Sequence, residues 1–402
     1  MRMSKKKEIV PKFRFPEFQR DGIDFVHGNK LFKSITNKNH NSDLPILAIT
    51  QDQGAVPRDQ IEYNVTVTDK SLSNYKVVEV GDFIISLRSF QGGIEYSRFK
   101  GICSPAYIIL RKREENISEL YYKYFFKTWR YIQSLNRNLE GIRDGKMISY
   151  SQFSSVKVPY PRSFKEQQKI ADCLSSIDEL IDAENRKLKA LEKYKKGLMQ
   201  KLFPAEGKTL PEWRFPEFRG KSEWRIKPLG KICTNYDSRR IPITEKDRVK
   251  GEIPYIGASG VIDYINDFIF DEDLLCVSED GANLVARTYP IAFSISGKTW
   301  VNNHAHVLKF SHKYTQDIVE SYLNMINLQD FLTGMAQPKL NRAKLDIIPI
   351  PLPEEEEQQK IADCLSEVDK IITEQSNKVE QLKAHKEGLM QGLFPSLEEA
   401  DV

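Results

Sequence analysis

A stretch of ten residues, EQQKIADCLS, occurs twice in this chain, at 166–175 and again at 357–366. The likeness extends further along the chain. Of the 39 aligned positions in 166–204 and 357–395, 22 are identical, and both copies end in GLMQxLFP. A catalytic site is rarely built twice within one chain. The duplication therefore predicts a repeated structural frame, and no other feature of the sequence constrains the fold as strongly.

Apolar residues recur in both copies at alternating steps of four and three, which is the spacing of the a and d positions of a heptad coiled coil. In the first copy these residues are Ile170, Leu174, Ile177, Ile181, Leu188, Leu191, Leu198 and Leu202. In the second copy they are Ile361, Leu365, Val368, Ile372, Val379, Leu382, Leu389 and Leu393. Each copy therefore predicts a helix of about 36 residues, or about 54 Å at a rise of 1.5 Å per residue.

Polar residues interrupt each apolar seam at matching places, Glu184 and Lys195 in the first copy and Gln375 and Lys386 in the second. A polar group in such a seam lowers stability but fixes register and the orientation of the partner. The shared interruptions favour pairing of the two helices with each other over two unrelated core helices.

A second repeat, PKFRFPEF at 11–18 and PEWRFPEF at 211–218, comes before each of two unlike globular regions. The order is thus short motif, globular region and long helix, followed by the same three parts again. Proline-punctuated segments, VKVPYP at 156–161 and DIIPIPLP at 346–353, lead into the long helices. Proline ends a strand there, and the polar run after it starts a helix.

The globular regions, about 22–160 and 222–352, contain short β-branched runs bounded by Gly, Pro and Asp, which predict strands. One helical stretch follows the strands in each region, at 117–135 and at 315–334. We therefore expect an α+β chain: two globular α/β domains, two long helices that pair as a coiled coil, and an internal repeat of this frame. The expected division is 1–163 and 205–354 for the domains, 164–204 and 355–395 for the helices, and 396–402 for a tail.

This arrangement resembles the specificity subunit of a Type I restriction-modification system. The resemblance covers nearly the whole chain and is carried by the paired EQQKIADCLS helices, the GLMQxLFP endings, the two RFPEF segments, and the VPYP and IPIPLP segments. Each motif alone is weak, but their combination is specific.

The resemblance implies that each globular region is a target-recognition domain, which reads one half of a split, asymmetric sequence in double-stranded DNA. It implies that the two helices form an antiparallel coiled coil, which gives the chain a pseudo-twofold internal repeat, sets the distance between the halves and helps to dock two modification subunits, which methylate adenine. Restriction subunits add ATP-driven translocation and cleavage. S-adenosylmethionine, ATP and Mg²⁺ are accordingly expected in the partner subunits, and no cofactor is expected on this chain.

Patterns for catalysis or metal binding within this chain are weak. An adenine N6-methyltransferase needs a loop containing Pro-Pro to hold its target base, and the chain has no Pro-Pro dipeptide. AFSISGKT at 292–299 resembles a phosphate-binding loop, but Ala292 replaces the first glycine and no helical pattern follows.

His304 and His306 alternate, so a strand would place both imidazoles on one face. No matching ligand spacing lies nearby, which favours a polar face or a DNA contact over a metal site. SEDG at 278–281 is interpreted as a turn.

Base edges and phosphates are contacted mainly by Arg, Lys, Asn, Gln, Ser and His. In the first region, RSFQGGIEYSR and GIRDGK supply the candidates Arg88, Ser89, Gln91, Arg98, Arg143 and Lys146. Gly92 and Gly93 would allow close approach of the backbone there. In the second region, SGKTWVNNHAH and MAQPKLNRAK supply Lys298, Asn302, Asn303, His304, Gln337, Lys339 and Arg342. MAQPKLNRAK in the second region corresponds in position to GIRDGKMIS in the first. We therefore expect both segments to contact DNA or both to contact a partner subunit. The bases that are read do not follow from the sequence.

Charge does not decide between functions, because 60 Lys and Arg residues against 56 Asp and Glu residues leave a net charge of only +4. Two alternatives remain: a protein scaffold with two adaptor domains, and a nuclease with built-in specificity. DNA binding with a steep salt dependence would exclude the scaffold.

The chain has five scattered cysteines and no CxxC pair, which predicts a cytoplasmic protein. It has no long apolar stretch and no apolar run after MRMSKKKEIVPKF, so we expect no signal peptide and no contact with a membrane.

Overall fold

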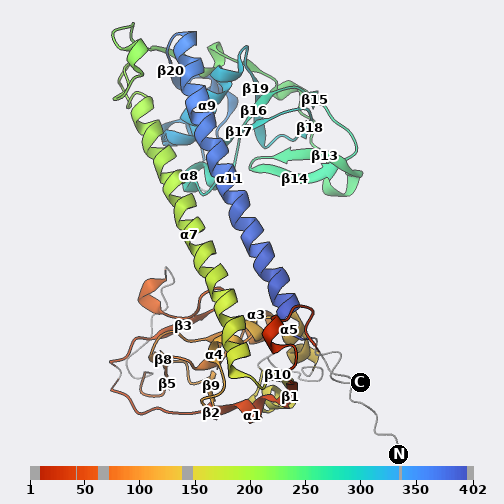
Figure 1. Cartoon of the computed structure of the whole chain (residues 1–402). Helices are drawn as coiled ribbons and strands as arrows, with labels where there is room; N and C mark the ends of the chain where they lie inside the picture. The colour runs from red at the N-terminus through yellow and green to blue at the C-terminus, as the bar shows by residue number, and fades with distance from the viewer. Residues whose placement is uncertain (1–9, 42, 62–71, 138–147, 335–336, 396–402) are drawn as a thin grey trace, which may run out of the picture. The chain divides into compact units, whose positions relative to one another are not determined.

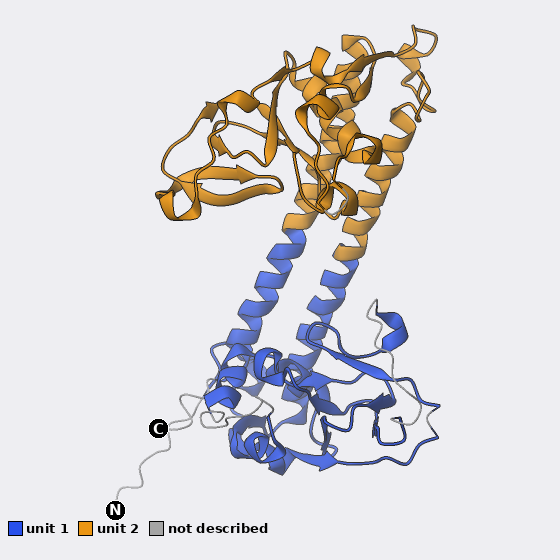
Figure 2. Ribbon diagram, turned by 180° about the vertical axis from the view of Figure 1, so that it is seen from behind, with its two compact units in different colours: residues 1–184, 378–402 blue, residues 185–377 orange. Residues whose placement is uncertain are grey.

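The structure is a computed structural model that describes residues 10–41, 43–61, 72–137, 148–334 and 337–395. Two long helices run through it, α7 (Phe164–Leu202) and α11 (Glu355–Leu393), each of 39 residues (Figure 1). The chain divides into unit 1, residues 1–184 and 378–402, and unit 2, residues 185–377 (Figure 2). Each unit therefore holds one globular region together with part of both long helices.

The two helices pair antiparallel within each unit. In unit 1, Asp178 of α7 pairs with Lys386 of α11, and Glu184 of α7 pairs with Lys378. Residue numbers therefore rise along α7 while they fall along the adjacent α11. In unit 2, Lys195 of α7 meets Asp369 of α11. Every predicted seam position is buried or partly buried, whereas the positions between them are mostly exposed. The heptad pattern and the antiparallel pairing are confirmed.

Unit 1 is built around a four-stranded antiparallel sheet with the order β2-β9-β6-β7. Two-stranded pairs β1-β10, β3-β4 and β5-β8 accompany it. The strands are β1 (Ile23–His27), β2 (Phe32–Ile35), β3 (Leu47–Thr50), β4 (Gly54–Pro57), β5 (Lys76–Val78), β6 (Phe83–Ile85), β7 (Glu95–Tyr96), β8 (Gly101–Cys103), β9 (Ile108–Lys112) and β10 (Lys157–Pro161). Strand β10 ends at the proline-rich segment, and α7 begins three residues later.

Short helices complete unit 1. They are α1 (Gly28–Leu31), α3 (Ser89–Gly92), α4 (Glu119–Phe125), α5 (Trp129–Arg137) and α6 (Tyr150–Ser155). Ser118 caps α4 by accepting a bond from Tyr121 N–H, and Ser149 with Gln152 forms a capping box on α6. The helical stretch predicted at 117–135 is thus two helices, α4 and α5, with a break at 126–128.

Unit 2 repeats the order of strands with different sequence. Its four-stranded sheet is β12-β19-β16-β17, and β11-β20 forms the separate pair. A second sheet, β14-β13-β18-β15, corresponds to the pairs β3-β4 and β5-β8 of unit 1. The strands are β11 (Arg225–Pro228), β12 (Thr234–Asn235), β13 (Lys250–Gly257), β14 (Gly260–Ile265), β15 (Phe270–Asp271), β16 (Leu274–Ser278), β17 (Ala292–Ile295), β18 (Lys298–Val301), β19 (Ala305–Lys309) and β20 (Pro349–Leu352).

The helices of unit 2 also match those of unit 1. They are α8 (Asn283–Ala286), α9 (Lys313–Met325) and α10 (Arg342–Asp346), with a 3-10 turn η7 (Gln329–Phe331). Asn341 caps α10 as Ser149 caps α6, and each of these short helices leads into the strand before a long helix. The duplication predicted from the frame therefore extends to the topology of the globular regions.

Candidate nucleic-acid interface

The duplicated ten residues hold each globular region onto its long helix. In unit 1, Arg14 of the RFPEF motif donates two hydrogen bonds to the Glu166 carboxylate, at 2.7 and 2.9 Å, and a third to Asp21 O. Both side chains of the ion pair are buried. In unit 2, Arg214 makes the same pair of bonds to Glu357, at 2.8 and 2.6 Å. The two sequence repeats are therefore two halves of one contact, which explains why they occur together.

The next residue of the repeat, Gln167 or Gln358, joins three segments in each unit. Gln167 donates to Pro161 O at 2.8 Å and accepts from Ser118 N–H at 2.9 Å. Gln358 donates to Pro353 O at 2.8 Å and accepts from the Thr315 hydroxyl at 2.8 Å. Each glutamine thereby fixes the start of the long helix to the end of the preceding strand and to the region's own helix.

The polar interruptions of the seam form ion pairs between the two long helices. Lys195 pairs with Asp369 in unit 2, and Lys386 pairs with Asp178 in unit 1, both at 2.5 Å. The two pairs occupy corresponding positions of the repeat. Burial raises the pKa of Asp178, but bonds from Lys386 and the Tyr124 hydroxyl outweigh it and bring the pKa below its usual value. These contacts select the antiparallel register, as the sequence pattern suggested.

The predicted first reading loop forms α3, the short helix between β6 and β7. Arg88 and Gln91 are exposed on it. Ser89 is only 1% exposed, and its hydroxyl accepts a hydrogen bond from Ser86 N–H at 2.9 Å. The expectation for Ser89 is therefore corrected: its hydroxyl shapes the turn that presents Arg88, because the turn folds the side chain inward.

The Gly92-Gly93 pair does permit a close backbone approach, but to the protein itself. Gly93 has φ of +82°, and a Cβ there would lie 2.2 Å from Phe126 O. Only glycine fits this geometry without strain. The glycines thus seat α3 against the junction of α4 and α5.

Lys127, at the same junction, binds three segments of unit 1. Its ammonium donates to Gln51 O at 3.0 Å, to Gly92 O at 2.9 Å, and to the Glu95 carboxylate. Glu95 is buried, and burial raises the pKa of its carboxyl to about 7 despite the opposing charge of Lys127. The β3–β4 turn, α3 and the start of α5 therefore form one platform.

The remaining predicted residues of unit 1 are placed differently. Arg98 is exposed and lines a groove of about 920 Å³ with Lys123, Lys127 and the turn at 51–54. Arg143 and Lys146 lie outside the described residues. Sequence reasoning missed two exposed residues on this platform, Trp129 and Arg130. No sequence pattern singled out Trp129, because its outward position depends on where α5 begins and how it packs.

In unit 2 the structure brings the two predicted segments together at the loop after β16. His304 Nδ1 lies 2.9 Å from the Asp280 carboxylate, and Lys339 Nζ lies 3.2 Å from Glu279. Leu340 N–H donates to Glu279 O at 2.8 Å. Asn303, His304, Gln337 and Lys339 are all exposed around this loop. The prediction of a turn at SEDG is wrong: Ser278 is the last residue of β16, and Asp280 forms an isolated bridge with Lys339. Glu279 and Asp280 hold the candidate DNA-contacting side chains in place.

His306 lies beneath this surface and is 1% exposed. Its Nε2 is 2.7 Å from Leu340 O, and its Nδ1 is 2.6 Å from the Asp237 carboxylate. The carbonyl oxygen and an ionised Asp237 carboxylate are both acceptors, so the buried ring links Asp237 to Leu340. Burial opposes ionisation of Asp237, but His306, Val307 N–H and Arg240 bring the pKa of Asp237 below its usual value. Arg240 also donates to Glu279 at 2.8 Å.

Two further expectations for this region are wrong. His304 and His306 do not share a face, because β19 begins at Ala305 and leaves His304 in the exposed turn before it. Asn302 is 5% exposed, and its side-chain oxygen accepts from His304 N–H. Asn302 therefore shapes that turn instead of presenting its amide to a ligand.

Lys298 and Arg342 are exposed and make local contacts. Lys298 Nζ lies 4.8 Å from the centre of the Phe268 ring, and Arg342 lies 3.5 Å from Asp346. The segment 292–299, which resembled a phosphate-binding loop, forms parts of β17 and β18, so it lacks the loop and helix that phosphate binding requires.

Among the residues that the structure describes, no three His, Cys, Asp or Glu side chains are grouped to hold a metal ion. Nor does any described helix have the length and apolar character to cross a membrane.

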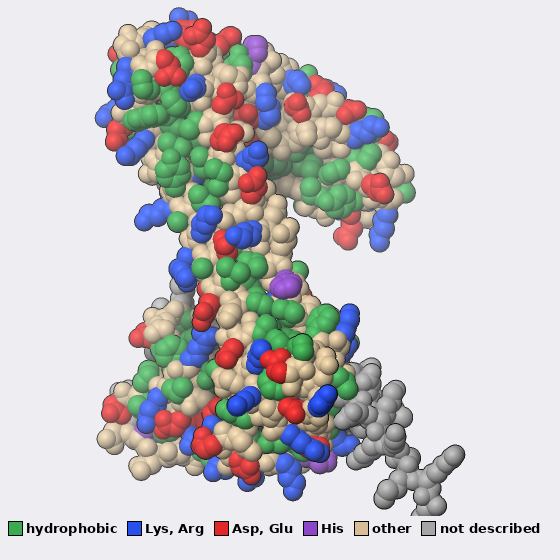
Figure 3. Space-filling view, viewed as in Figure 1, with side chains coloured by type: hydrophobic (Ala, Val, Ile, Leu, Met, Phe, Trp, Pro, Cys, Tyr) green, Lys and Arg blue, Asp and Glu red, His purple; other side chains and the backbone are tan. Residues whose placement is uncertain are grey.

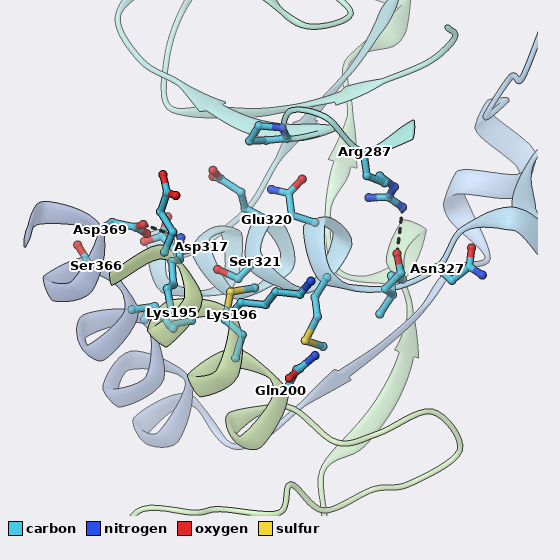
Figure 4. A pocket seen from close by; sticks show the side chains of 18 of the residues that line it. Lys195, Lys196, Gln200, Arg287, Asp317, Glu320, Ser321, Asn327, Ser366 and Asp369 are labelled. Carbon is cyan, nitrogen blue, oxygen red and sulfur yellow. Dashed lines mark hydrogen bonds and ion pairs between the residues drawn. The ribbon is translucent and has the colours of Figure 1, made fainter. Parts of the chain in front are cut away.

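Unit 2 also contains a groove of about 860 Å³ between α7, α9 and α11. Figure 4 shows side chains of both signs facing it, among them Lys195, Asp317, Glu320 and Asp369. The Arg287 guanidinium is used internally, since it donates to Leu323 O and Ile326 O at the end of α9. These charges offset one another, and the groove offers no single chemistry for a ligand.

Comparisons with known proteins agree on one family. The model described as "Type I restriction modification DNA specificity domain" matches residues 21–193 and again 221–383. A putative type I restriction enzyme specificity subunit of Haemophilus influenzae is 33% identical over 38% of this chain, which spans 39% of that protein's length. The MjaVIII specificity subunit of Methanocaldococcus jannaschii is 25% identical over 81% of this chain and 80% of its own.

Solved structures share the fold at low identity. The crystal structure of the S subunit of a Type I restriction-modification system from M. genitalium aligns with a TM-score of 0.59 and 15% identity, covering 96% of this chain and 99% of that one. A chain from a study of assembly and conformational transition of the type I R-M system aligns with a TM-score of 0.57 and 14% identity, covering 93% and 98%.

Proposed function

Since the chain belongs to the family of Type I restriction-modification DNA specificity domains, we propose that it is the DNA-binding subunit of such a complex and reads a two-part, asymmetric target in double-stranded DNA. One observation carries this proposal. Two units with the same topology are anchored by the same Arg–Glu and Gln contacts, yet they expose different side chains on corresponding surfaces. Two dissimilar readers on one frame suit a target whose halves differ.

In unit 1, the proposed DNA contacts are Arg88 and Gln91 on α3 and Arg98 at the neighbouring groove. Arginine can bond a guanine edge twice or pair with a phosphate, and glutamine suits adenine. In unit 2, the proposed contacts are Asn303, His304, Gln337 and Lys339. Charge supports this assignment, because Glu279 and Asp280 orient Lys339 and His304 while leaving them exposed.

The long helices are proposed to set the spacing of the two half-sites. Both α7 and α11 contribute residues to both units, and their register is fixed by the Lys195–Asp369 and Lys386–Asp178 pairs. Two readers on one side of B-DNA are separated by about one helical turn, 34–36 Å. A helix of 39 residues is long enough for that span.

Two copies of a shared partner, the modification subunit, are proposed to dock on the duplicated helices. The inner positions of the ten-residue repeat are identical because they anchor the units. Lys169 and Lys360 belong to the anchors as well, because they pair with Glu17 and Glu217 of the RFPEF motifs. Gln168 and Asp172 are matched by Gln359 and Asp363, and in both copies the glutamine bonds the aspartate on the outward side of the helix. Corresponding docking surfaces for identical partners would retain such residues.

We propose that the chain has no catalytic role of its own. Partner subunits would supply adenine methylation with S-adenosylmethionine, and restriction subunits would supply ATP- and Mg²⁺-dependent translocation and cleavage. The chain would direct that chemistry to its target. A soluble setting with these partners and DNA agrees with the reducing environment expected from five free cysteines.

The decisive experiment is methylation mapping in cells that express the chain together with its modification subunits. The expected result is one two-part motif with unlike halves. Replacing Arg88 and Arg98 by alanine should relax or weaken recognition of one half only, by about 1–3 kcal/mol for each arginine that bonds a base. Replacing His304 and Lys339 should affect the other half. Equal weakening at both halves would contradict the two-reader proposal.

Two alternatives give different results. A protein scaffold would show no DNA binding with a steep salt dependence, whereas each neutralised phosphate adds about 0.9 to the salt slope for a DNA reader. A self-contained nuclease would cut DNA when the purified chain is given Mg²⁺ alone. Turnover by the chain without partners would overturn the proposed division of labour.

The spacing can be tested by removing one heptad from each helix, residues 185–191 and 376–382, which are corresponding positions of the repeat. The span should shorten by about 10 Å, from seven residues at 1.5 Å each. The gap between half-sites should then shrink by about three base pairs, at roughly 3.4 Å per pair, or binding should fail. An unchanged gap would show that the helices do not set the spacing.

A further inference from the structure

Trp129, the first residue of α5, is 70% exposed. The fold of unit 1 makes little use of its indole, although other aromatic side chains of this unit are buried in its core. Leaving an indole in water forgoes a large hydrophobic stabilisation. An exposed tryptophan therefore marks a candidate contact surface, and the neighbouring groups indicate what it contacts.

The direction of Trp129 follows from helix geometry. Tyr131 and Leu135 of α5 are buried in the core, while Asn136 reaches α3 by donating to Phe90 O at 2.8 Å. A Cβ on Gly93 would lie 3.4 Å from Ile132, so Ile132 also faces α3. Residues three and seven positions apart lie on one side of a helix. Trp129 therefore lies on the α3 side, one turn before Ile132.

The platform beneath Trp129 is fixed. Lys127, two residues earlier, holds Gln51 O and Gly92 O at 3.0 and 2.9 Å. Gln51 in turn donates to Arg88 O at 3.4 Å. The indole is thus carried on the same framework as the proposed DNA contacts Arg88 and Gln91.

The exposed groups around Trp129 favour nucleic acid over a protein partner. They are mostly amides and guanidinium groups, with one carboxylate and one apolar side chain: Gln51, Gln53, Gln91, Arg88, Arg130, Asp52 and Leu87. Arginine also occurs in protein interfaces, but three exposed amides and a carboxylate differ from the desolvated centre of such an interface. Arginine and glutamine around an aromatic face are instead the combination that binds phosphates, base edges and base faces together.

We propose that the Trp129 indole packs on the face of a base at the half-site read by unit 1, where it acts as a wedge at one base step. This inference rests on the proposed function and adds a residue and a mode of contact to it. Aromatic or apolar wedges at base steps stabilise a locally unstacked duplex and so favour sequences that unstack readily. Trp129 would thereby contribute to specificity without bonding a base edge.

The test uses the full chain assembled with its modification subunits, and two duplexes designed from the methylation map. One duplex carries both half-sites, and the other has the unit 1 half scrambled. Trp129→Ala should weaken binding to the intact target at least about fivefold, the lower end for removal of one base–aromatic stack. The salt slope should stay unchanged, because every phosphate partner is retained. Binding to the scrambled duplex should equal that of wild type.

Matched variants separate stacking from other roles. Trp129→Phe keeps an aromatic face and should retain most of the affinity. Val80→Ala removes an exposed apolar side chain of the same unit, 61% exposed, and should change nothing. Arg88→Ala should lower affinity too, and it should reduce the salt slope if it contacts phosphate.

Fluorescence gives a direct readout. Of the four tryptophans, Trp224 and Trp300 are buried, and Trp213, 37% exposed, packs on Phe215. In a Trp213→Phe background, Trp129 is the accessible fluorophore. The intact duplex should quench it and protect it from iodide, and the scrambled duplex should do so less.

The outcomes are distinct. Wild-type binding by Trp129→Ala, with specific DNA binding by the assembly intact, overturns this inference and leaves the proposed function standing. Failure to assemble with the modification subunits at unchanged DNA affinity also overturns it, since Trp129 would then be a protein contact. An assembly that binds no specific DNA at all overturns the proposed function itself.

Discussion

Unit 1 and unit 2 share one topology but fill it with different side chains. The core of unit 1 is aromatic: Phe32 packs edge-on against Phe83 and Tyr122, with ring centres 5.4 and 5.1 Å apart. The core of unit 2 is mainly aliphatic, with Leu275, Leu308 and Ile318 among its buried residues. The difference teaches that strand order does not depend on particular core residues. The pattern of buried positions, and the shared anchor to α7 and α11, determine it.

The polar side chains beneath the two proposed DNA-contacting surfaces also differ between the units. Unit 1 relies on Lys127 with the buried Glu95, whereas unit 2 relies on His306 with Asp237. The outer surfaces also differ. In Figure 3 the face of the β13–β14 hairpin shows a cluster of apolar side chains, among which Val261, Ile262 and Tyr264 are about half exposed. The corresponding β3–β4 turn of unit 1 is polar, with Gln51, Asp52 and Gln53 exposed.

The largest expected effect concerns the anchor that both units share. Arg14→Ala would leave Glu166 buried without its partner, and breaking such a buried pair costs about 3–5 kcal/mol. Unit 1 should lose stability while unit 2 keeps its own, and Arg214→Ala should do the reverse. Hydrogen exchange followed by mass spectrometry on the full chain would resolve the two units.

Exposed ion pairs provide the control for this prediction. Arg162 pairs with Asp24 in the same bidentate geometry, but the two side chains are 66% and 42% exposed. Arg162→Ala should therefore leave the unfolding temperature nearly unchanged. If Arg14→Ala were equally mild, or if it loosened both units alike, the idea of two independent, equivalent anchors would be wrong.

A smaller effect, of about 2 kcal/mol, is expected from His306→Leu, and only in unit 2. The change removes the ring nitrogens that contact Asp237 and Leu340 O, and a buried acceptor left unsatisfied costs about 1–3 kcal/mol. Asp237 keeps Val307 N–H at 2.9 Å and Arg240 at 3.6 Å, which limits the destabilisation. Faster hydrogen exchange at 337–341 would report it.

The same variant has a pH signature. The pKa of Asp237 is lowered in the folded chain, so its stabilisation is present above its usual value near 4 and is lost as pH falls through the folded value. His306→Leu should reduce this acid sensitivity. His304→Ala is the matched control, because that histidine is exposed and pairs with Asp280 at the surface. Equal effects of the two variants would show that burial of His306 is not what matters.

The smallest effect at neutral pH is expected from Glu95→Gln in unit 1. Burial raises the pKa of Glu95 to about 7, so the folded chain keeps a proton that the unfolded chain releases near pH 4.5. Stability therefore falls as pH rises from about 4.5 to 7, by up to about 3 kcal/mol in total. Glu95→Gln should remove this slope from unit 1. Near pH 7, the absence of the ion pair with Lys127 should offset most of the stability that the variant gains by lacking a buried ionisable carboxyl. Thermal unfolding between pH 5 and 8 would test it, and a slope that persists in the variant would contradict it.

Local pattern was enough to predict several elements. The heptad spacing predicted the buried side of α7 and α11, because a stripe repeating every 3.5 residues can be buried only against another helix. Alternating apolar runs between glycines and prolines predicted strands such as β6 and β16. Residue type predicted exposed candidates such as Arg88 and Lys339, since charged side chains are rarely buried without a partner.

Other features depended on how turns and helices fold, which the pattern of residue types does not reveal. Ser89 and Asn302 have the chemistry of DNA-reading residues, but their turns fold the side chains inward to bond Ser86 and His304 N–H. His306 lies two residues from His304 yet is buried, because β19 starts between them. Trp129 drew no attention in the sequence, since only the packing of α5 on α3 shows that its indole is left outside.

The sequence by itself determined the duplicated frame and the long paired helices, because periodicity and repetition are properties of the chain read in order. Only the tertiary structure decided that the ten repeated residues are an anchor, through the bonds of Arg14 to Glu166 and of Arg214 to Glu357. It also decided which candidate side chains remain exposed. The anchor bonds join residues 152 and 143 positions apart, and no local pattern contains that information.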